Sequence, residues 1–237
     1  MEASLSGKRI VLTGVSRGVG LATARLLLSE GAEVLGVARD PERLSRVTNE
    51  LVASHGERFT SLALDLTDRE TPGRLQHAAE KRFGALDALV NNAGVMLSHD
   101  PSITDEPEPL VEATMETNVF VPLRLTRALV PLLLRGTEPR LVHVSSGAGT
   151  HHGLTEPKIA SYRLSKWTLN GLTLLQAQEF TGKIAVNALD PGWVRTDLGG
   201  PEAPGVPEES AEGLLAVLRL PFETTGRFWK NGEEIPW

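Results

Sequence analysis

The chain has 237 residues with no cysteine and a single tyrosine. Without cysteine it can form no disulfide, thiolate nucleophile or thiolate metal site, which fits a reducing compartment. No apolar run approaches the roughly 18 residues that span a bilayer, and the start lacks the pattern of a secretory signal. Basic residues form no stripe and the formal net charge is −6, so we expect neither nucleic acid nor membrane as a partner. These absences favour a cytoplasmic protein that binds a small molecule, with no metal site.

Short apolar runs alternate with helical patterns along most of the chain. Six β-rich runs stand out: KRIVLT, EVLGVA, FTSLAL, LDALVNN, RLVHVSS and KIAVNAL, which begin at positions 8, 33, 59, 86, 140 and 183. Apolar residues at helical spacing separate them and predict helices that include 41–55, 107–135 and 160–180. Nearly continuous apolar strands separated by helices indicate a parallel sheet that is covered on both faces.

We therefore predict one α/β domain over residues 1–237, a Rossmann-like doubly wound parallel sheet of about seven strands with helices on both faces. Its binding crevice should lie at the carboxyl ends of the strands. The segment 196–210 is rich in proline and glycine, which predicts a mobile surface loop, plausible as a lid. A short helix at about 208–219 and a strand near GRFWK at 226–230 complete the pattern.

A glycine-rich turn follows the first strand. Gly14, Gly18 and Gly20 open the next helix. Glycine tolerates positive φ and lets backbone N–H groups approach a pyrophosphate at the positive end of the helix. A tight turn without a ligand is the alternative, and the position after the first strand of a repeating βα pattern disfavours it.

The end of the second strand bears on the choice between NAD and NADP. An NAD site usually has an acidic residue there, whereas an NADP site replaces it and supplies arginine to the 2′-phosphate. Here Ala38 and Arg39 stand at this end, with Arg17 inside the glycine turn. Two guanidiniums on one phosphate favour NADP(H) over NAD(H). Asp40 would reverse this interpretation if the register shifted; we expect it instead to cap the helix that begins at Pro41.

The only tyrosine, Tyr162, precedes one of six lysines, Lys166, by four positions. In a helix these positions share a face, so both side chains can project into one crevice. A free phenol has a pKa of about 10, and a nearby ammonium stabilises the phenolate and lowers that pKa. Without other motifs, the same spacing would describe an ordinary helix surface.

Several spaced motifs agree with these observations. They are TGxxxGxG at 13–20, Asp65, NNAG at 91–94, Asn118, the serines at 145–146, YxxxK at 162–166 and PGWVRTD at 191–197. Together they resemble the short-chain dehydrogenase/reductase family from residue 8 onward, and the last motif is similar to the carbonyl reductase branch. The chain lacks the long insertion before Tyr162 that monomeric mammalian carbonyl reductases carry, which argues against a monomer, and the family resemblance implies a homodimer or homotetramer.

The resemblance implies a role for each matching residue. Asn118, Ser146, Tyr162 and Lys166 would form a catalytic tetrad, with Ser146 chosen over Ser145 because the family's serine stands three residues before the glycine that Gly149 matches. The implied cofactor-binding residues also include Tyr162 and Lys166; the others are Gly14, Ser16, Arg17, Gly18, Gly20, Arg39, Asp65, Leu66, Asn91, Ala93, Gly94, Pro191, Gly192, Val194 and Thr196.

The predicted activity is NADPH-dependent reduction of a small ketone or aldehyde, with Tyr162 as the proton donor and Ser146 holding the carbonyl oxygen. One alternative is 3-oxoacyl-carrier-protein reductase, which the acidic segment at 98–112 disfavours because the carrier is itself acidic. Another is a non-catalytic NADP-sensing protein on the same fold. The sequence leaves open the substrate and whether His151, His152, Met96 or Trp193 contacts it.

Overall fold

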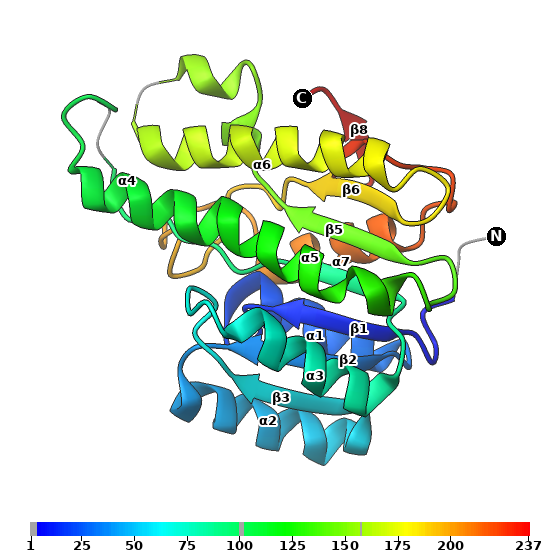
Figure 1. Ribbon diagram of the computed structural model, residues 1–237. Helices are drawn as coiled ribbons and strands as arrows, with labels where there is room; N and C mark the ends of the chain where they lie inside the picture. Colours follow the sequence, from blue (N-terminus) through cyan, green and yellow to red (C-terminus); the bar gives the residue numbers. More distant parts are fainter. Residues whose placement is uncertain (1–3, 100–101, 157) are drawn as a thin grey trace.

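The computed structural model describes residues 4–99, 102–156 and 158–237. One sheet of eight strands runs through the molecule in the order β3-β2-β1-β4-β5-β6-β7-β8. Every neighbouring pair is parallel except β7 and β8, which are antiparallel (Figure 1). The strand order reverses between β1 and β4, which is the topological switch point where α/β sheets bind ligands.

The strands and helices alternate along the chain as the apolar pattern predicts. The strands are β1 (Arg9–Thr13), β2 (Glu33–Ala38), β3 (Phe59–Ala63), β4 (Ala88–Asn91), β5 (Arg140–Val144), β6 (Ala185–Leu189), β7 (Phe228–Lys230) and β8 (Glu233–Ile235). The α-helices are α1 (Gly18–Ser29), α2 (Pro41–His55), α3 (Thr71–Phe83), α4 (Glu108–Met115), α5 (Val121–Leu133), α6 (Ala160–Glu179) and α7 (Pro207–Leu218). Short 3-10 turns are η1 (Gly56–Arg58), η3 (Gly147–Gly149) and η4 (Gly153–Thr155), and η2 (Glu116–Phe120) is a π-helical turn.

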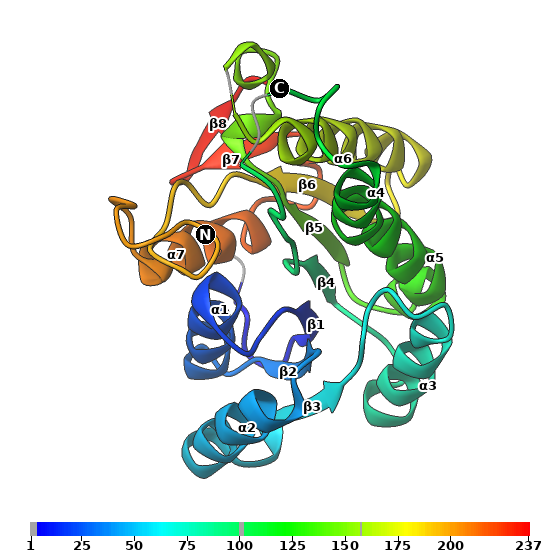
Figure 2. The same cartoon turned by 90° about the vertical axis from the view of Figure 1, so that its left-hand side faces the viewer.

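Helices cover both faces of the sheet. Figure 2 shows α1, α2 and α7 on one face and α3, α5 and α6 on the other. The strands alternate between the two resulting apolar cores: on β1, Ile10 and Leu12 pack into one and Val11 into the other. Because the side chains of these central strands are buried apart from the first residues of β1 and β2, the fold leaves the strand ends free for chemistry.

The fold confirms the predicted doubly wound sheet and departs from the sequence prediction in three details. A three-residue strand, β8, pairs with β7 and raises the strand number to eight. The π-turn η2 divides the helix expected over 107–135 into α4 and α5. Helix α7 begins at Pro207, so 207–210 is helical and not part of a loop.

The helices of the described part of the chain are too short or too polar to cross a membrane.

Candidate active site

The four residues of the expected tetrad come from three elements around the carboxyl end of β5. Tyr162 and Lys166 lie on the buried face of α6, Ser146 follows β5 at the start of η3, and Asn118 lies in η2. Helix α6 begins immediately after Lys158 and Ile159, which both have positive φ. A β-branched residue in the left-handed region is strained, and such strain is often found at functional sites.

The two adjacent serines have different surroundings. Ser145 is 1% exposed and its Oγ donates to Asn170 Oδ1 at 2.5 Å, so it fastens β5 to α6. Ser146 accepts a hydrogen bond from Ala148 N at 3.1 Å and caps η3. Ser146 is also the serine whose side chain acts on Tyr162, since its hydroxyl lowers the pKa of that phenol. The structure therefore brings the serine chosen from the sequence to the tyrosine, and gives the other a packing role.

The electrostatics of Tyr162 differ from the sequence prediction. Burial raises the pKa of Tyr162 to about 12, the hydroxyl of Ser146 acts to lower it, and the negative charge of Asp190 acts to raise it. The expected lowering by Lys166 is not seen: burial has the largest effect on this pKa, and the neighbours that act on it are Ser146 and Asp190. The Lys166 Nζ atom lies 5.6 Å from the centroid of the tyrosine ring.

Lys166 is itself nearly inaccessible, with 4% of its surface exposed. Its Nζ donates to the Val144 carbonyl at 2.9 Å. Burial lowers the pKa of Lys166 to about 8, and Asp190 acts in the opposite direction. An ammonium with this pKa is still protonated at neutral pH, but a modest rise in pH discharges it.

Asn118 is fixed by three side-chain hydrogen bonds. Its Oδ1 accepts from Val95 N at 2.9 Å, and its Nδ2 donates to Val95 O and to Ser165 Oγ. A Cβ on Gly94 would lie 3.3 Å from Asn118 Oδ1 and 3.5 Å from Lys166 Nζ. The π-turn thus joins the segment after β4 to α6, and Gly94 leaves room for both side chains.

The glycine turn has the shape of a phosphate cradle. Gly14 and Gly18 have φ values of +77° and +54°. A Cβ on Gly20 would lie 2.1 Å from the Gly14 carbonyl oxygen, and one on Gly18 would lie 2.9 Å from Thr196 Cγ2. No side chain caps the N-terminus of α1 and its first turn has no acidic residue. The free N–H groups and the positive helix end fit a pyrophosphate.

The NNAG segment is built mainly into the protein itself. Thr13 Oγ1 accepts from the backbone N–H groups of Asn92 and Ala93, both at 3.0 Å. Asn91 is 3% exposed, and its Nδ2 faces His143 Nδ1 at 3.3 Å. Asn91 therefore lies in the core behind the crevice, whereas Ala93 and Gly94 are partly exposed.

The residues that bear on cofactor choice lie at the surface beside α1 and α2. Asp40 accepts from Glu42 N and Arg43 N, both at 3.0 Å, and caps α2, which confirms the predicted cap. Arg39 is exposed and its charge helps to lower the pKa of Asp65, after the larger effect of Thr67, which donates to that carboxylate. Both bonds of the cap are made to Asp40 Oδ1, so the carboxylate that follows β2 serves as a helix cap.

Arg17 does not stand free beside Arg39. Its guanidinium forms an ion pair with Asp197, and Arg43 Nη1 reaches the same carboxylate at 3.5 Å. All three side chains are at least 40% exposed, so these pairs are weak and solvent competes with them. They nevertheless place the segment after β6 against the glycine turn.

The segment 191–206 folds back on itself. Val194 and Gly205 form an isolated bridge, and Arg195 donates to the carbonyls of Ala203 and Pro204. Trp193 is 60% exposed while its Nε1 donates to Gly199 O at 2.7 Å. Pro191, Gly192 and Thr196 are partly exposed, and Val194 is buried. Mobility of the predicted lid stays a prediction.

Two buried titratable residues of this region were not predicted from the sequence. His143 on β5 and Asp190 after β6 are 0% and 3% exposed. Each is a polar residue within or directly after an apolar strand, which is the one signal that the sequence offered.

Ser16 and Leu66 are partly exposed near the turns that the sequence assigns to the cofactor.

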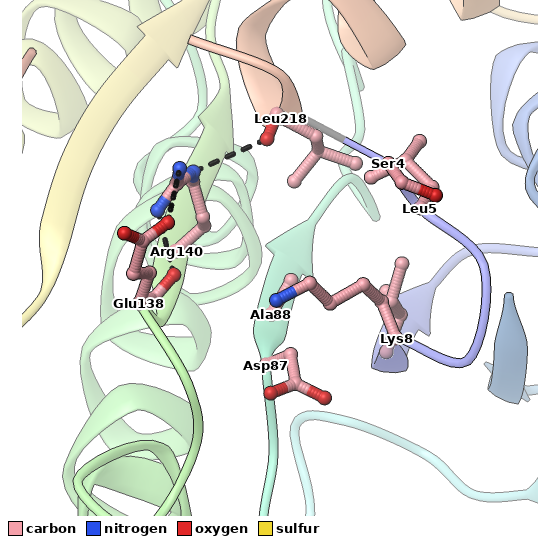
Figure 3. Close-up of a pocket in the computed structure, with 9 residues that line it drawn as sticks. Ser4, Leu5, Lys8, Asp87, Ala88, Glu138, Arg140 and Leu218 are labelled. Carbon is pink, nitrogen blue, oxygen red and sulfur yellow. Dashed lines mark hydrogen bonds and ion pairs between the residues drawn. The ribbon is translucent and has the colours of Figure 1, made fainter. Parts of the chain in front are cut away.

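A small cavity lies at the amino ends of β1, β4 and β5, at the opposite end of these strands from the tetrad (Figure 3). It has a volume of about 30 Å³, enough for roughly one water, and includes Lys8, Asp87 and Arg140 from the amino ends of the strands. The Arg140 guanidinium donates to the Leu218 carbonyl at 3.1 Å. Two separate ion pairs, Asp87 with Arg9 and Arg140 with Glu138, border this cavity, and none of the tetrad residues lines it.

Comparisons with known proteins agree with the geometry. The model of the short chain dehydrogenase family matches residues 8–205. An NADPH-dependent pterin aldehyde reductase of Arabidopsis thaliana is 31% identical over 82% of this chain and 78% of its own length. A 3-oxoacyl-(acyl-carrier-protein) reductase of Thermotoga maritima is 30% identical over 97% of this chain and 87% of its own length.

Solved structures give the same result. The NADPH-bound carbonyl reductase from chicken fatty liver superposes with a TM-score of 0.88 at 28% identity and covers 98% of this chain and 100% of its own. A short chain dehydrogenase of Shigella flexneri complexed with NADP has a TM-score of 0.89 at 25% identity, with 98% and 100% covered.

Proposed function

This chain belongs to the short-chain dehydrogenase family, and from this premise we propose that it is an NADPH-dependent reductase that converts a small ketone or aldehyde to an alcohol. The observation that carries the proposal is the juxtaposition of Tyr162, Ser146 and Lys166 at the carboxyl end of β5. A buried phenol that pairs with a hydroxyl beside an ammonium is suited to donate a proton to a developing oxyanion.

Each side chain has a distinct part in this reaction. The nicotinamide cofactor supplies the hydride when it is bound. As negative charge develops on the carbonyl oxygen, Ser146 Oγ holds that oxygen and the Tyr162 hydroxyl donates its proton. The raised pKa keeps Tyr162 protonated at neutral pH, as a proton donor requires. Lys166 stabilises the resulting phenolate, and Asn118 keeps the segment after β4 in place.

The preference for NADPH rests on the surface at the end of β2. Arg39 is exposed there, and Asp40 is engaged as the cap of α2. An exposed guanidinium suits a 2′-phosphate, whereas an NAD site would offer a carboxylate to the ribose. The relatives whose names mention NADPH are consistent with this proposal.

The first experiment measures thermal stability with saturating NADPH, with saturating NADH and without nucleotide. A ligand that binds only the folded state raises stability by RT ln(1 + [L]/Kd). NADPH should shift the wild type more than NADH, and Arg39→Ala should erase the difference. Arg46→Ala removes an exposed arginine of α2 and serves as the control. Equal shifts by both nucleotides in the wild type would contradict the preference.

A panel of ketones, aldehydes and an acyl-carrier-protein thioester then separates the activities. The relative from Thermotoga maritima makes a 3-oxoacyl substrate the second candidate. Against it, the acidic residues Asp105, Glu108 and Glu112 are next to the segment after β4, and like charges repel an acidic carrier. Nucleotide binding without turnover of any of these compounds would instead support a non-catalytic NADP-sensing protein.

We also propose that the chain forms a homo-oligomer through α6. The outward face of this helix exposes Leu164, Trp167, Leu174 and Leu175, and Phe120 of η2 is exposed as well. These positions repeat at helical spacing opposite the buried face that holds Tyr162. An ordered apolar face of this kind is typical of an interface.

A further inference from the structure

A buried carboxylate lies at the end of β6, outside the expected tetrad. Asp190 is 3% exposed, and both of its oxygens have partners. Oδ1 accepts from Gly192 N at 3.0 Å, and Oδ2 pairs with Lys230 Nζ at 3.0 Å. Lys230 comes from β7, at 43% side-chain exposure. Burying a charge has a desolvation cost even when the charge is paired. A carboxylate kept at such a position next to the expected tetrad is therefore a candidate for a functional role.

Asp190 joins three segments that surround the tetrad. Its backbone N donates to Trp229 O at 2.8 Å, which fixes it to β7. A Cβ on Gly147 would lie 2.9 Å from Asp190 Oδ2, so the carboxylate packs directly under the residue that follows Ser146. Through Gly192 it also holds the turn of the segment 191–196. The Asp190 side chain therefore contacts both the loop of Ser146 and the segment 191–196, which is expected to meet the nicotinamide.

We propose that Asp190, paired with Lys230, is a positioning residue that aligns the Ser146 loop with the segment 191–196 and sets the electrostatic field at Tyr162. The catalytic consequence rests on the proposed reductase function; the effect on Tyr162 does not. The carboxylate acts through the tetrad and does not itself exchange a proton with substrate.

The charge of Asp190 acts on both titrating members of the tetrad. Its contribution to the pKa of Tyr162 is upward, in the same direction as burial. Its contribution to the pKa of Lys166 is also upward, against the larger lowering by burial. Inside a protein a fixed charge is screened less than in water, so it acts over a longer distance. The negative charge favours a protonated phenol and a charged ammonium, which is the state that reduction requires.

The other charged groups near α6 do not duplicate this effect. On α6 itself, Lys166 lies beside the ring. Before α4, Glu106 accepts from Ser161 N and Oγ, and Glu116 of η2 pairs with Arg124. His143 of β5 is held neutral at pH 7 because burial, and to a smaller extent the charge of Lys166, lowers its pKa. The remaining acids of α4, Glu108 and Glu112, are exposed or partly exposed at the surface.

The test uses the fact that Tyr162 is the only tyrosine. The ultraviolet absorbance of phenolate therefore reports this residue alone, without substrate or cofactor. Stopped-flow jumps to alkaline pH read the absorbance before the chain unfolds. Asp190→Asn keeps an oxygen for Gly192 N and removes the charge; Lys230→Met keeps the carboxylate and removes its partner. Asp68→Asn and Lys183→Met change exposed residues away from the tetrad and are the matched controls.

We expect Asp190→Asn to lower the apparent pKa of Tyr162, and Lys230→Met and both controls not to lower it. If the pair had a purely structural role, breaking it from either side would let water reach the phenol and lower its pKa. An equal decrease in the apparent pKa of Tyr162 in Asp190→Asn and Lys230→Met would therefore overturn the proposal. An unchanged titration in folded Asp190→Asn would also overturn it. If Asp190→Asn alone does not fold, the double variant Asp190→Asn/Lys230→Met, whose pair is neutral, replaces it in the same titration.

The pH profile of carbonyl reduction gives the catalytic readout. The alkaline limb of kcat/KM should move to lower pH in Asp190→Asn and to higher pH in Lys230→Met, because the two variants change the local charge in opposite directions. A limb that moves the same way in both would contradict the electrostatic part of the proposal. Absence of turnover in the wild type would refute the reductase function and leave the tyrosine titration to decide the role of Asp190.

Discussion

Tyr162 combines almost complete burial with two polar neighbours that act on its pKa in opposite directions. Burial and Asp190 favour the phenol, while Ser146 favours the phenolate. The balance keeps the proton on the tyrosine at neutral pH. At the scale of single residues, this state is the one that the proposed proton donation requires.

Tyr162→Phe should reduce carbonyl turnover by about 10²–10⁴-fold, because it removes the proton donor. The ring still fills the same buried space, so the thermal shift with NADPH should remain near that of the wild type. Single-turnover kinetics and thermal unfolding measure the two effects. Retention of wild-type turnover would show that another group donates the proton.

His143 should make the protein sensitive to mild acid. Its Nε2 donates to Gln176 Oε1 at 2.8 Å, and its Nδ1 accepts from the Asn91 amide at 3.3 Å. Burial lowers the pKa of His143 to about 4. The unfolded chain therefore takes up the proton first as the pH falls, so stability is complete above the ordinary pKa of about 6.5 and is lost toward pH 4.

Between pH 7 and pH 5 this residue should cost about 2 kcal/mol of the free energy of unfolding, at 1.36 kcal/mol per pH unit. Urea unfolding at both pH values measures it. His143→Gln should lose this part of the pH dependence, whereas His77→Gln, at an exposed position of α3, should keep it. Equal pH dependence in the wild type and His143→Gln would refute the assignment.

At the scale of elements, the glycine turn joins β1 to α1, and its backbone packs too closely at Gly20 to admit a side chain. Gly20→Ala would place a Cβ 2.1 Å from the Gly14 carbonyl oxygen. Because backbone must move, we expect a loss of roughly 1–3 kcal/mol or more in stability and a weaker shift with either nucleotide. Thermal unfolding with and without nucleotide measures both.

Gly73→Ala is the matched control for this substitution. Gly73 is an exposed residue within α3, and its Cβ would meet nothing within 4 Å. The same change there should stabilise the protein by roughly 0.5–1 kcal/mol, because alanine has the higher helix propensity. If both variants behaved alike, the close approach at Gly20 would not be the cause.

For the whole molecule, the exposed apolar face of α6 predicts association. Leu175 is 68% exposed, and Leu175→Glu should shift the chain toward the monomer in size-exclusion chromatography with light scattering. Val52→Glu replaces a 40% exposed residue of α2 and should leave the oligomer unchanged. A wild-type chain that stays monomeric at every concentration would contradict the proposed interface.

Most of the fold could be predicted from the sequence. The period of the apolar residues indicates which segments are strands and which are helices, because burial on both faces requires continuous apolar strands. The edge strand β8 escaped prediction because EEI, at 233–235, has no apolar period. The turn η2 escaped because a π-turn changes hydrogen bonding without changing the apolar spacing.

The sequence by itself determined the sheet, the glycine turn and the spacing of Tyr162 and Lys166, because these depend on local periodicity and on residues close in the chain. Only the tertiary structure decided their environment: Ser145 was separated from Ser146 by its bond to Asn170, and Arg17 was drawn to Asp197. The pKa of Tyr162 likewise depends on burial and on Asp190, which is 28 positions away in the numbering. Charge interactions act through space and solvent exclusion, and neither is encoded in the distance along the chain.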